Sequence, residues 1–283
     1  MRPPRPEDAQ AVAALGSPYA PEHLDVLWVE REWTEPGFDL AEDARLTDTA
    51  YIAVWDGRGG KAWLDAMGAP TEELLDWAEG RAQEKGLVRA FGGGWVGDEA
   101  ILGLFERAGY RPVRHFFRMQ AELAGVSEPP EWPDGVTVRT FTPGDERLFY
   151  DVHQETFADH WEHEQPDPYD EWAHWLLQPP MHEPDLWFVA EEDGEPAGIA
   201  ICHRRHEVPG FGRVDILGVR RPWRRRGLGR ALMLHAFAEF RRAGLTHADL
   251  GVDGESLTGA TRLYERVGMH VAARRDTYEK SLT

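Results

Sequence analysis

The stretch LGVRRPWRRRGLGRAL, from Leu217 to Leu232, decides the fold of this chain. A strand pattern runs into a turn rich in arginine and glycine, and the turn opens a helical pattern. Backbone N–H groups at the start of a helix are unpaired, and the helix dipole adds positive potential there. Glycine lets a phosphate group approach the backbone closely. The stretch therefore predicts a phosphate-binding turn between a strand and a helix.

Arginine is concentrated in this turn, although the formal net charge of the chain is −19. The residues concerned are Arg220, Arg221, Arg224, Arg225, Arg226 and Arg230. A pyrophosphate or a 3′-phosphate would explain them, and the alternative is a solvated basic turn before an ordinary helix. The turn is not a Walker P-loop, because no Gly-Lys-Ser/Thr follows. It is not a Rossmann fingerprint either, because the third glycine is absent.

Two motifs resemble a known family. Arg224 to Gly229 resembles the Arg/Gln-x-x-Gly-x-Gly/Ala signature of the GCN5-related N-acetyltransferases (GNAT), and Ala260 to Met269 resembles their second motif, a helix that ends in Leu-Tyr-x-x-x-Gly-Phe. The resemblance implies an α/β fold with a mixed sheet. It also implies transfer of an acetyl group from acetyl-CoA to an amine, by direct attack of the amine on the thioester.

The same resemblance assigns residues to acetyl-CoA. The strand before the signature is expected to splay from its neighbour and to hydrogen-bond the acetyl group and pantetheine arm, and the turn amides are expected to hold the pyrophosphate. The residues assigned in this way are Leu217, Gly218, Val219, Arg224, Arg225, Arg226, Gly227, Leu228, Gly229, Arg230 and Ser256. The family often has Asn where this chain has Ser256 or Leu257, and of these two only serine could still hydrogen-bond the pantetheine arm.

Two residues are candidates for proton transfer. Tyr264 matches the family tyrosine that protonates the departing thiolate, and its unperturbed pKa of about 10 lies above that of a thiol. The alternative is a packing residue on an amphipathic helix. Asp215 lies two residues before Leu217, so we expect it to share a face with Leu217 and Arg213 and to act as the base. The alternative is a structural ion pair with a nearby arginine.

The segment after the first helix of this half combines carboxylates with aromatic side chains. Asp159, Trp161 and Glu162 are the predicted acceptor contacts, because this combination suits a cationic amine. A plain solvated loop is the alternative. His160 and His163 have a spacing that a metal could use, but a flexible loop is a poor metal cage, and we expect no metal.

The chain also contains an internal repeat. Leu104 to Tyr110 corresponds to Leu263 to Met269, which suggests duplication of one domain. We predict a first domain over residues 1–124, a linker over 125–135 and a second, catalytic domain over 136–283. In the first domain the segment Asp65 to Pro70 replaces the signature and has one glycine and no arginine. The first domain is therefore predicted to be degenerate. Two such domains in tandem resemble the mycothiol synthases and their actinobacterial relatives, and in mycothiol synthases we expect a glutamate where Arg213 stands.

The hydrophobic periodicity predicts the remaining elements. Strands are expected at residues 25–30, 50–55, 62–65, 186–190, 197–202, 214–219, 248–252 and around Tyr278. Helices are expected at 71–85, 145–157, 169–177, 229–241 and 258–267. Gly92 to Gly94 are expected in a loop or a flexible lid.

Composition limits the remaining choices. The sequence contains no run of 18 apolar residues, which is the length that a membrane-spanning helix needs. Cys202 is the only cysteine, so no internal disulfide can form. We therefore expect a cytoplasmic protein. An acidic chain repels phosphate backbones, so nucleic acid is not an expected partner. We expect a small-molecule amine as partner. The expected oligomeric state is a monomer whose two domains form an internal pseudo-dimer, or a weak homodimer. The alternatives are a non-catalytic acyl-CoA sensor and a protein N-terminal acetyltransferase.

Overall fold

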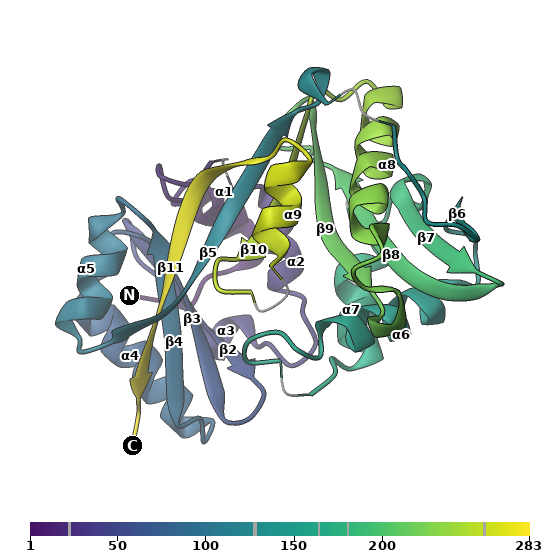
Figure 1. The fold of residues 1–283 in the computed structure, drawn as a ribbon. Helices are drawn as coiled ribbons and strands as arrows, with labels where there is room; N and C mark the ends of the chain where they lie inside the picture. Colours follow the sequence, from purple (N-terminus) through teal and green to yellow (C-terminus); the bar gives the residue numbers. More distant parts are fainter. Residues whose placement is uncertain (22–23, 127–128, 164, 180, 257–258) are drawn as a thin grey trace. The chain divides into compact units, whose positions relative to one another are not determined.

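The computed structural model describes residues 1–21, 24–126, 129–163, 165–179, 181–256 and 259–283. They form two compact units, drawn in Figure 1. Unit 1 contains residues 1–118, 253–255 and 272–283, and unit 2 contains 119–252 and 256–271. The last strand of the chain thus lies in the unit that the first residues build. The predicted sequence boundaries at residues 124 and 136 stay a prediction, because the units are not contiguous in sequence.

Unit 1 alternates short helices with a sheet. Its helical elements are η1 (Pro6–Asp8), α1 (Ala9–Ala13), α2 (Val26–Glu32), α3 (Leu40–Asp43), α4 (Glu72–Glu84) and α5 (Glu99–Arg107). Its strands are β1 (Ala44–Leu46), β2 (Ala50–Gly57), β3 (Lys61–Gly68), β4 (Arg89–Trp95), most of β5 (Arg111–Glu122) and most of β11 (His270–Ser281). The strand order is β1-β2-β3-β4-β11-β5.

Unit 2 repeats this plan. Its helical elements are η2 (Leu123–Gly125), α6 (Glu146–Phe157), α7 (Tyr169–Leu176), η3 (Pro184–Leu186), η4 (Arg221–Trp223), α8 (Leu228–Arg242) and α9 (Ala260–Arg266). Its strands are β6 (Val136–Thr140), β7 (Trp187–Glu192), β8 (Glu195–Arg204), β9 (Phe211–Val219) and most of β10 (His247–Asp253), in the order β10-β9-β8-β7-β6.

The two units share one irregularity of the sheet. In unit 2 the parallel pair β9–β10 is hydrogen-bonded only from Phe211↔His247 to Val214↔Leu250, although both strands continue. In unit 1 the parallel pair β3–β4 also ends after four residue pairs, at Leu64↔Gly92. The repeated ladder length supports the internal duplication that the sequence predicts.

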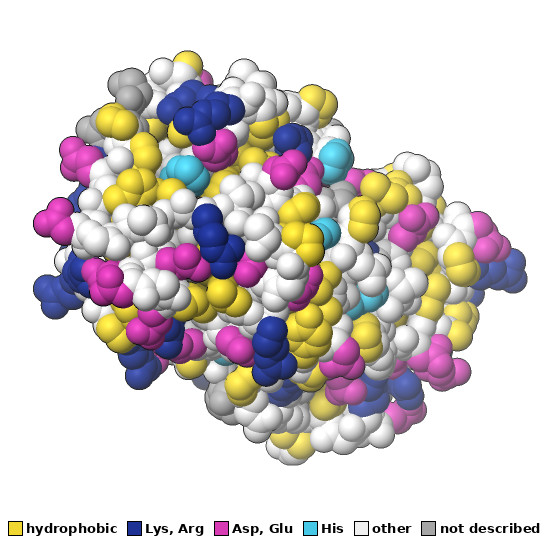
Figure 2. Space-filling view, turned by 90° about the vertical axis from the view of Figure 1, so that its right-hand side faces the viewer, with side chains coloured by type: hydrophobic (Ala, Val, Ile, Leu, Met, Phe, Trp, Pro, Cys, Tyr) yellow, Lys and Arg dark blue, Asp and Glu magenta, His cyan; other side chains and the backbone are white. Residues whose placement is uncertain are grey.

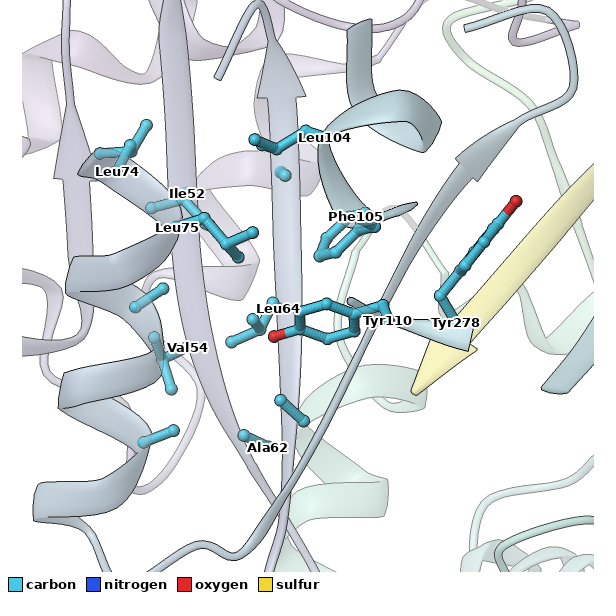
Figure 3. Packing of buried hydrophobic residues seen from close by; sticks show 14 of the residues in the cluster. Ile52, Val54, Ala62, Leu64, Leu74, Leu75, Leu104, Phe105, Tyr110 and Tyr278 are labelled. Carbon is cyan, nitrogen blue, oxygen red and sulfur yellow. The ribbon is translucent and has the colours of Figure 1, made fainter. Parts of the chain in front are cut away.

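The core of unit 1 explains the glycines of β4. A Cβ on Gly92 would lie 2.2 Å from the ring of Phe105, and one on Gly93 would lie 2.0 Å from the carbonyl oxygen of Asp276. Figure 3 shows Phe105 within the surrounding apolar cluster. The prediction of a loop or lid at Gly92–Gly94 is therefore wrong, because these glycines form a buried strand between a helix and β11.

One further element differs from its prediction. Residues 25–30 were expected to form a strand, but Val26–Glu32 is helix α2. The carboxylate of Asp25 accepts a hydrogen bond from the Leu27 amide at 3.0 Å, which is an N-cap contact. A short apolar run does not distinguish a strand from a helix, and here the Asp25 cap favours the helix.

The other predicted elements in the described residues are present, with ends shifted by a few residues. Gly109 and Gly268 end α5 and α9 in the left-handed region, with φ of 85° and 91°. Asp193 and Gly194 both have positive φ in the turn between β7 and β8. The predicted start of the last helix, Thr258, lies outside the described residues.

Candidate active site

The site of unit 2 begins where β9 loses its neighbour. Beyond Val214 the edge of β9 that faces β10 has no ladder partner, whereas its other edge pairs with β8 as far as Val219↔Gly198. Backbone groups of Leu217 to Val219 on the open edge can therefore pair with an extended, amide-containing ligand. The pantetheine arm of CoA has that character, and the splay itself agrees with what the family resemblance implied.

A β-bulge changes the direction of the side chains along β9. The register with β8 shifts between Ile201↔Ile216 and Cys202↔Val214, which leaves Asp215 as the extra residue. Before the bulge a Cβ on Gly212 would meet Phe240 of α8 at 2.6 Å, and after it a Cβ on Gly218 would meet Thr156 of α6 at 2.4 Å.

Even-numbered positions therefore face α8 before the bulge and α6 after it. The prediction that Asp215 and Arg213 share a face with Leu217 by simple alternation is wrong for Leu217, because the bulge turns Leu217 to the α8 face.

The turn after β9 presents its amides outward. Arg225 and Gly227 have left-handed φ of 63° and 90°, and Gly227 caps α8. Within the described residues the backbone N–H groups from Arg225 to Gly229 donate to no protein acceptor, and the first helical hydrogen bond runs from the Ala231 amide to the Gly227 carbonyl. Consecutive free amides at a helix start form an anion-binding nest.

The second motif lies beside this turn. A Cβ on Gly229 would be 3.3 Å from Leu263 of α9 and 3.7 Å from Val219 of β9, so the three elements meet there. Tyr264 follows on α9 and is 8% exposed, and burial raises the pKa of its hydroxyl to about 12. A phenol with that pKa stays protonated at neutral pH and can donate its proton to a thiolate.

The arginines of the turn are largely committed to carboxylates. Arg226 binds Glu192 through both terminal nitrogens, and Arg220 binds Glu155 and Glu195. The guanidinium of Arg226 lowers the pKa of Glu192, with help from the Trp223 indole. These pairs hold the turn in place, so its backbone amides rather than free guanidinium groups offer the clearest anion site.

Asp159, one of the predicted acceptor contacts, lies beside the turn. Its carboxylate accepts hydrogen bonds from Arg221 at 2.6 Å and from Arg224 at 3.4 Å, and these two contacts lower its pKa. Trp161 and Glu162 are half-buried in the segment after α6, where Glu162 has a φ of 58°. The structure therefore places Asp159 against the arginines of the signature turn, and acceptor contact by Asp159, Trp161 and Glu162 stays a prediction.

Ser256 is half-buried just before α9, and its carbonyl accepts a hydrogen bond from the Gly259 amide at 3.2 Å. Its role toward pantetheine stays a prediction. Leu257, the other residue considered there, lies outside the described residues.

Asp215 is part of a charged network across three strands. Its Oδ1 accepts from Arg213 Nε at 2.8 Å, and its Oδ2 lies 2.5 Å from His203 Nδ1. Arg213 also reaches Asp249, which is fully buried and accepts from Arg205 at 2.6 Å. Burial alone would raise the pKa of Asp215, but the charges of His203 and Arg213 outweigh it and hold that pKa below its usual value.

Charge is mixed on the surface. Over the face that Figure 2 shows, Lys and Arg side chains are interspersed with Asp and Glu. In the part of the chain that the structure describes, no group of three or more His, Cys, Asp or Glu side chains is placed to hold a metal ion, and no helix is long and apolar enough to cross a membrane.

Comparison with known proteins places this geometry in a family. The profile of the Acetyltransferase (GNAT) family matches residues 147–269. The mycothiol acetyltransferase of Thermobispora bispora is 32% identical over 77% of this chain and 79% of its own. That of Streptomyces coelicolor is 30% identical over 95% of this chain and 94% of its own. The chain belongs to the GNAT family of acetyltransferases. The prediction of an N-acetyltransferase enzyme is thereby confirmed at the level of the family.

Solved structures agree with this assignment. A GCN5-related N-acetyltransferase from Sphaerobacter thermophilus superposes with a TM-score of 0.79 at 32% identity, covering 99% of this chain and 95% of that one. A tandem GNAT protein from the clavulanic acid biosynthesis pathway shares the fold, with a TM-score of 0.71 at 13% identity over 98% of this chain and 93% of that one. The prediction of an α/β fold with tandem GNAT domains is confirmed.

Sequence reasoning missed two features of this GNAT site. His203 contacts Asp215, and Glu192 clamps the turn through Arg226 and Trp223. The hairpin signal at Asp193-Gly194 could have placed Glu192 near the site. No signal in one sequence could have located the bulge that brings His203 to Asp215.

Proposed function

We propose that unit 2 binds acetyl-CoA and transfers its acetyl group to a primary amine of a small molecule in a ternary complex. The observation that carries this proposal is the row of free amides from Arg225 to Gly229 directly beside the open edge of β9. The nest suits the pyrophosphate of CoA, and the strand edge suits the amides of the pantetheine arm. Leu217, Gly218, Val219, Leu228 and Arg230 complete the proposed CoA contacts.

The thioester then lies near the bulge, between β9 and α9. Attack by the neutral amine on the carbonyl carbon forms the C–N bond, and loss of the thiolate breaks the C–S bond. Tyr264 is the proposed acid that protonates the sulfur, since its raised pKa keeps the proton on the hydroxyl until a thiolate forms. The nitrogen releases its extra proton to water, and the Tyr264 phenolate takes a proton back from water, so the enzyme is restored.

Unit 1 is proposed to carry no second CoA site. Its strand β3 ends at Gly68, which has a φ of 75°, and Thr71 caps α4 with its own hydroxyl. Glu72 and Glu73 occupy the first turn of α4, where two negative charges oppose phosphate binding. The free amides and the arginine clamps of unit 2 have no counterpart in this segment.

The acceptor is proposed to be a small amine. The curated relatives are mycothiol acetyltransferases, so the unacetylated mycothiol precursor belongs among the compounds tested. Arg213 stands where we expect a glutamate in mycothiol synthases, and it is engaged with Asp215 and Asp249. This difference favours another acceptor of the same chemical class.

The test is a screen of primary amines with acetyl-CoA, read by mass spectrometry of the acetylated product and by release of free CoA. The panel contains the mycothiol precursor, polyamines, amino sugars, arylalkylamines and a peptide with a free N-terminus. Acetylation of a small amine supports the proposal. Acetyl-CoA binding without any product would favour the acyl-CoA sensor, and acetylation of the peptide alone would favour the protein N-terminal acetyltransferase.

A further inference from the structure

Both oxygens of Asp215 already accept hydrogen bonds, one from Arg213 and one from His203. Its pKa is also held low, so the carboxylate is a weak proton acceptor near neutral pH. A base for the acceptor ammonium therefore has to be sought among its neighbours. This question rests on the proposed acetyl transfer, because an alkylammonium cannot attack a thioester until it has lost a proton.

His203 has the geometry that Asp215 lacks. It stands opposite Arg213 in the β8–β9 ladder, so it shares the sheet face of that arginine, and the residue is 5% exposed. Nδ1 faces the Asp215 carboxylate at 2.5 Å, and a carboxylate can only accept, so Nδ1 carries the hydrogen. The lone pair of the neutral ring then lies on Nε2.

The Nε2 atom remains available. No described residue hydrogen-bonds it, and it is not one of the buried polar atoms without a partner, so it keeps contact with solvent. The bulge at Asp215 is what permits this arrangement, because the extra residue brings the carboxylate of β9 under the ring of β8. A buried carboxylate, an imidazole and an open Nε2 together form an acid–base dyad.

We propose that Nε2 of His203 is the base that takes the proton from the acceptor ammonium, with Asp215 as the residue that positions the imidazole ring. The N–H bond of the ammonium breaks and an N–H bond forms at Nε2. The freed amine attacks the acetyl carbon, and the imidazolium is stabilised by Asp215 until it releases the proton to water. The net reaction turns ammonium and acetyl-CoA into amide, CoA and one proton.

The charges around the ring support this role. Burial lowers the pKa of His203, but Asp215, Glu207 and Glu183 together raise it above its usual value. Two arginines of the same network are themselves paired with carboxylates: Arg213 binds Asp215, and Arg205 binds Glu207 and Asp249. The neighbouring carboxylates therefore stabilise the imidazolium that forms when His203 accepts the proton from the ammonium.

The experiment compares two acceptor amines. 2-Phenylethylamine is protonated at neutral pH and needs a base, whereas 4-methoxyaniline is already neutral and does not. For His203→Gln we expect kcat/KM for 2-phenylethylamine to fall by about 10²-fold or more, the usual range for loss of a general base. The rate with 4-methoxyaniline should change by less than about tenfold. Glutamine can still donate to Asp215, so the fold is kept.

Two companion variants sharpen the result. Asp215→Asn removes the anion that raises the pKa of His203, so the acidic limb of the kcat/KM profile for 2-phenylethylamine should move to lower pH. His206→Gln is the matched control, because His206 is exposed and its Nε2 lies 3.4 Å from the Glu183 carboxylate, away from Asp215. It should leave both the rates and the profile unchanged.

Equal losses for the two amines in His203→Gln, or an unchanged acidic limb in Asp215→Asn, would overturn the proposal while leaving acetyl transfer intact. A wild-type protein that binds acetyl-CoA but acetylates neither these two amines nor any panel amine would instead refute the proposed function, and the dyad with it.

Discussion

Replacing Gly227 with alanine tests whether the turn is a phosphate nest. Gly227 has a φ of 90°, and a Cβ added there meets nothing within 4 Å, so no clash complicates the result. A non-glycine residue in the left-handed region costs about 1–2 kcal/mol. Without ligand, the alanine variant can relax out of the left-handed region. Bound pyrophosphate would require the left-handed conformation again, so the conformational cost would weaken the binding of acetyl-CoA.

The expected result is a rise in the Kd for acetyl-CoA of roughly 5- to 30-fold, because about 1.4 kcal/mol corresponds to tenfold. Isothermal titration measures this directly. Gly244→Ala is the matched control at the other end of α8, where φ is 81° and a Cβ again meets nothing.

At this end of α8 the Leu245 amide donates a hydrogen bond to the Phe240 carbonyl at 2.9 Å and fixes the helix end. Backbone strain in Gly244→Ala should therefore lower the melting temperature and leave the Kd for acetyl-CoA unchanged. An unchanged Kd in Gly227→Ala would refute the nest.

Three further outcomes follow from the same site. Tyr264→Phe should lower kcat by tenfold or more with an unchanged Kd for acetyl-CoA, and a full-rate variant would remove Tyr264 from the mechanism. Asp249→Asn should cost about 3–5 kcal/mol in urea unfolding, because Asp249 is fully buried and its loss removes one carboxylate from the buried Arg205 and one from the half-buried Arg213; a loss below about 1 kcal/mol would contradict this.

The pKa of His203 is raised on folding, so its contribution to stability is present below the unfolded value of about 6.5 and is lost as the pH rises through the folded value. His203→Gln should therefore destabilise the protein more at about pH 6 than at about pH 9, and the reverse order would contradict the ion pair with Asp215.

The sequence predicted the general architecture because its strongest signals are local. The glycine at each helix end, the hairpin turn at Asp193 and the Thr71 cap all act within a few residues, and each is found where expected. The signature turn was recognisable for the same reason. Its amides are free because of the backbone conformation at Arg225 and Gly227, and of these two residue types only the glycine indicated that conformation.

The errors arise where distant parts of the chain decide the outcome. The glycines of β4 looked like a loop because nothing nearby in sequence shows that Phe105 and β11 pack against them. The bulge in β9 depends on its register with β8, so simple alternation placed Leu217 beside Asp215. The contact of Asp159 with Arg221 and Arg224 could not be foreseen either, because these arginines lie more than sixty positions later.

The most direct test of the central claim is titration of acetyl-CoA into the purified wild-type protein, with the number of sites per chain as the readout. We expect one site, because the free amides of Arg225 to Gly229 belong to unit 2 and unit 1 presents Glu72 and Glu73 at the corresponding helix start. Two sites would contradict the view that unit 1 is degenerate. No binding would contradict the proposed acetyl transfer altogether.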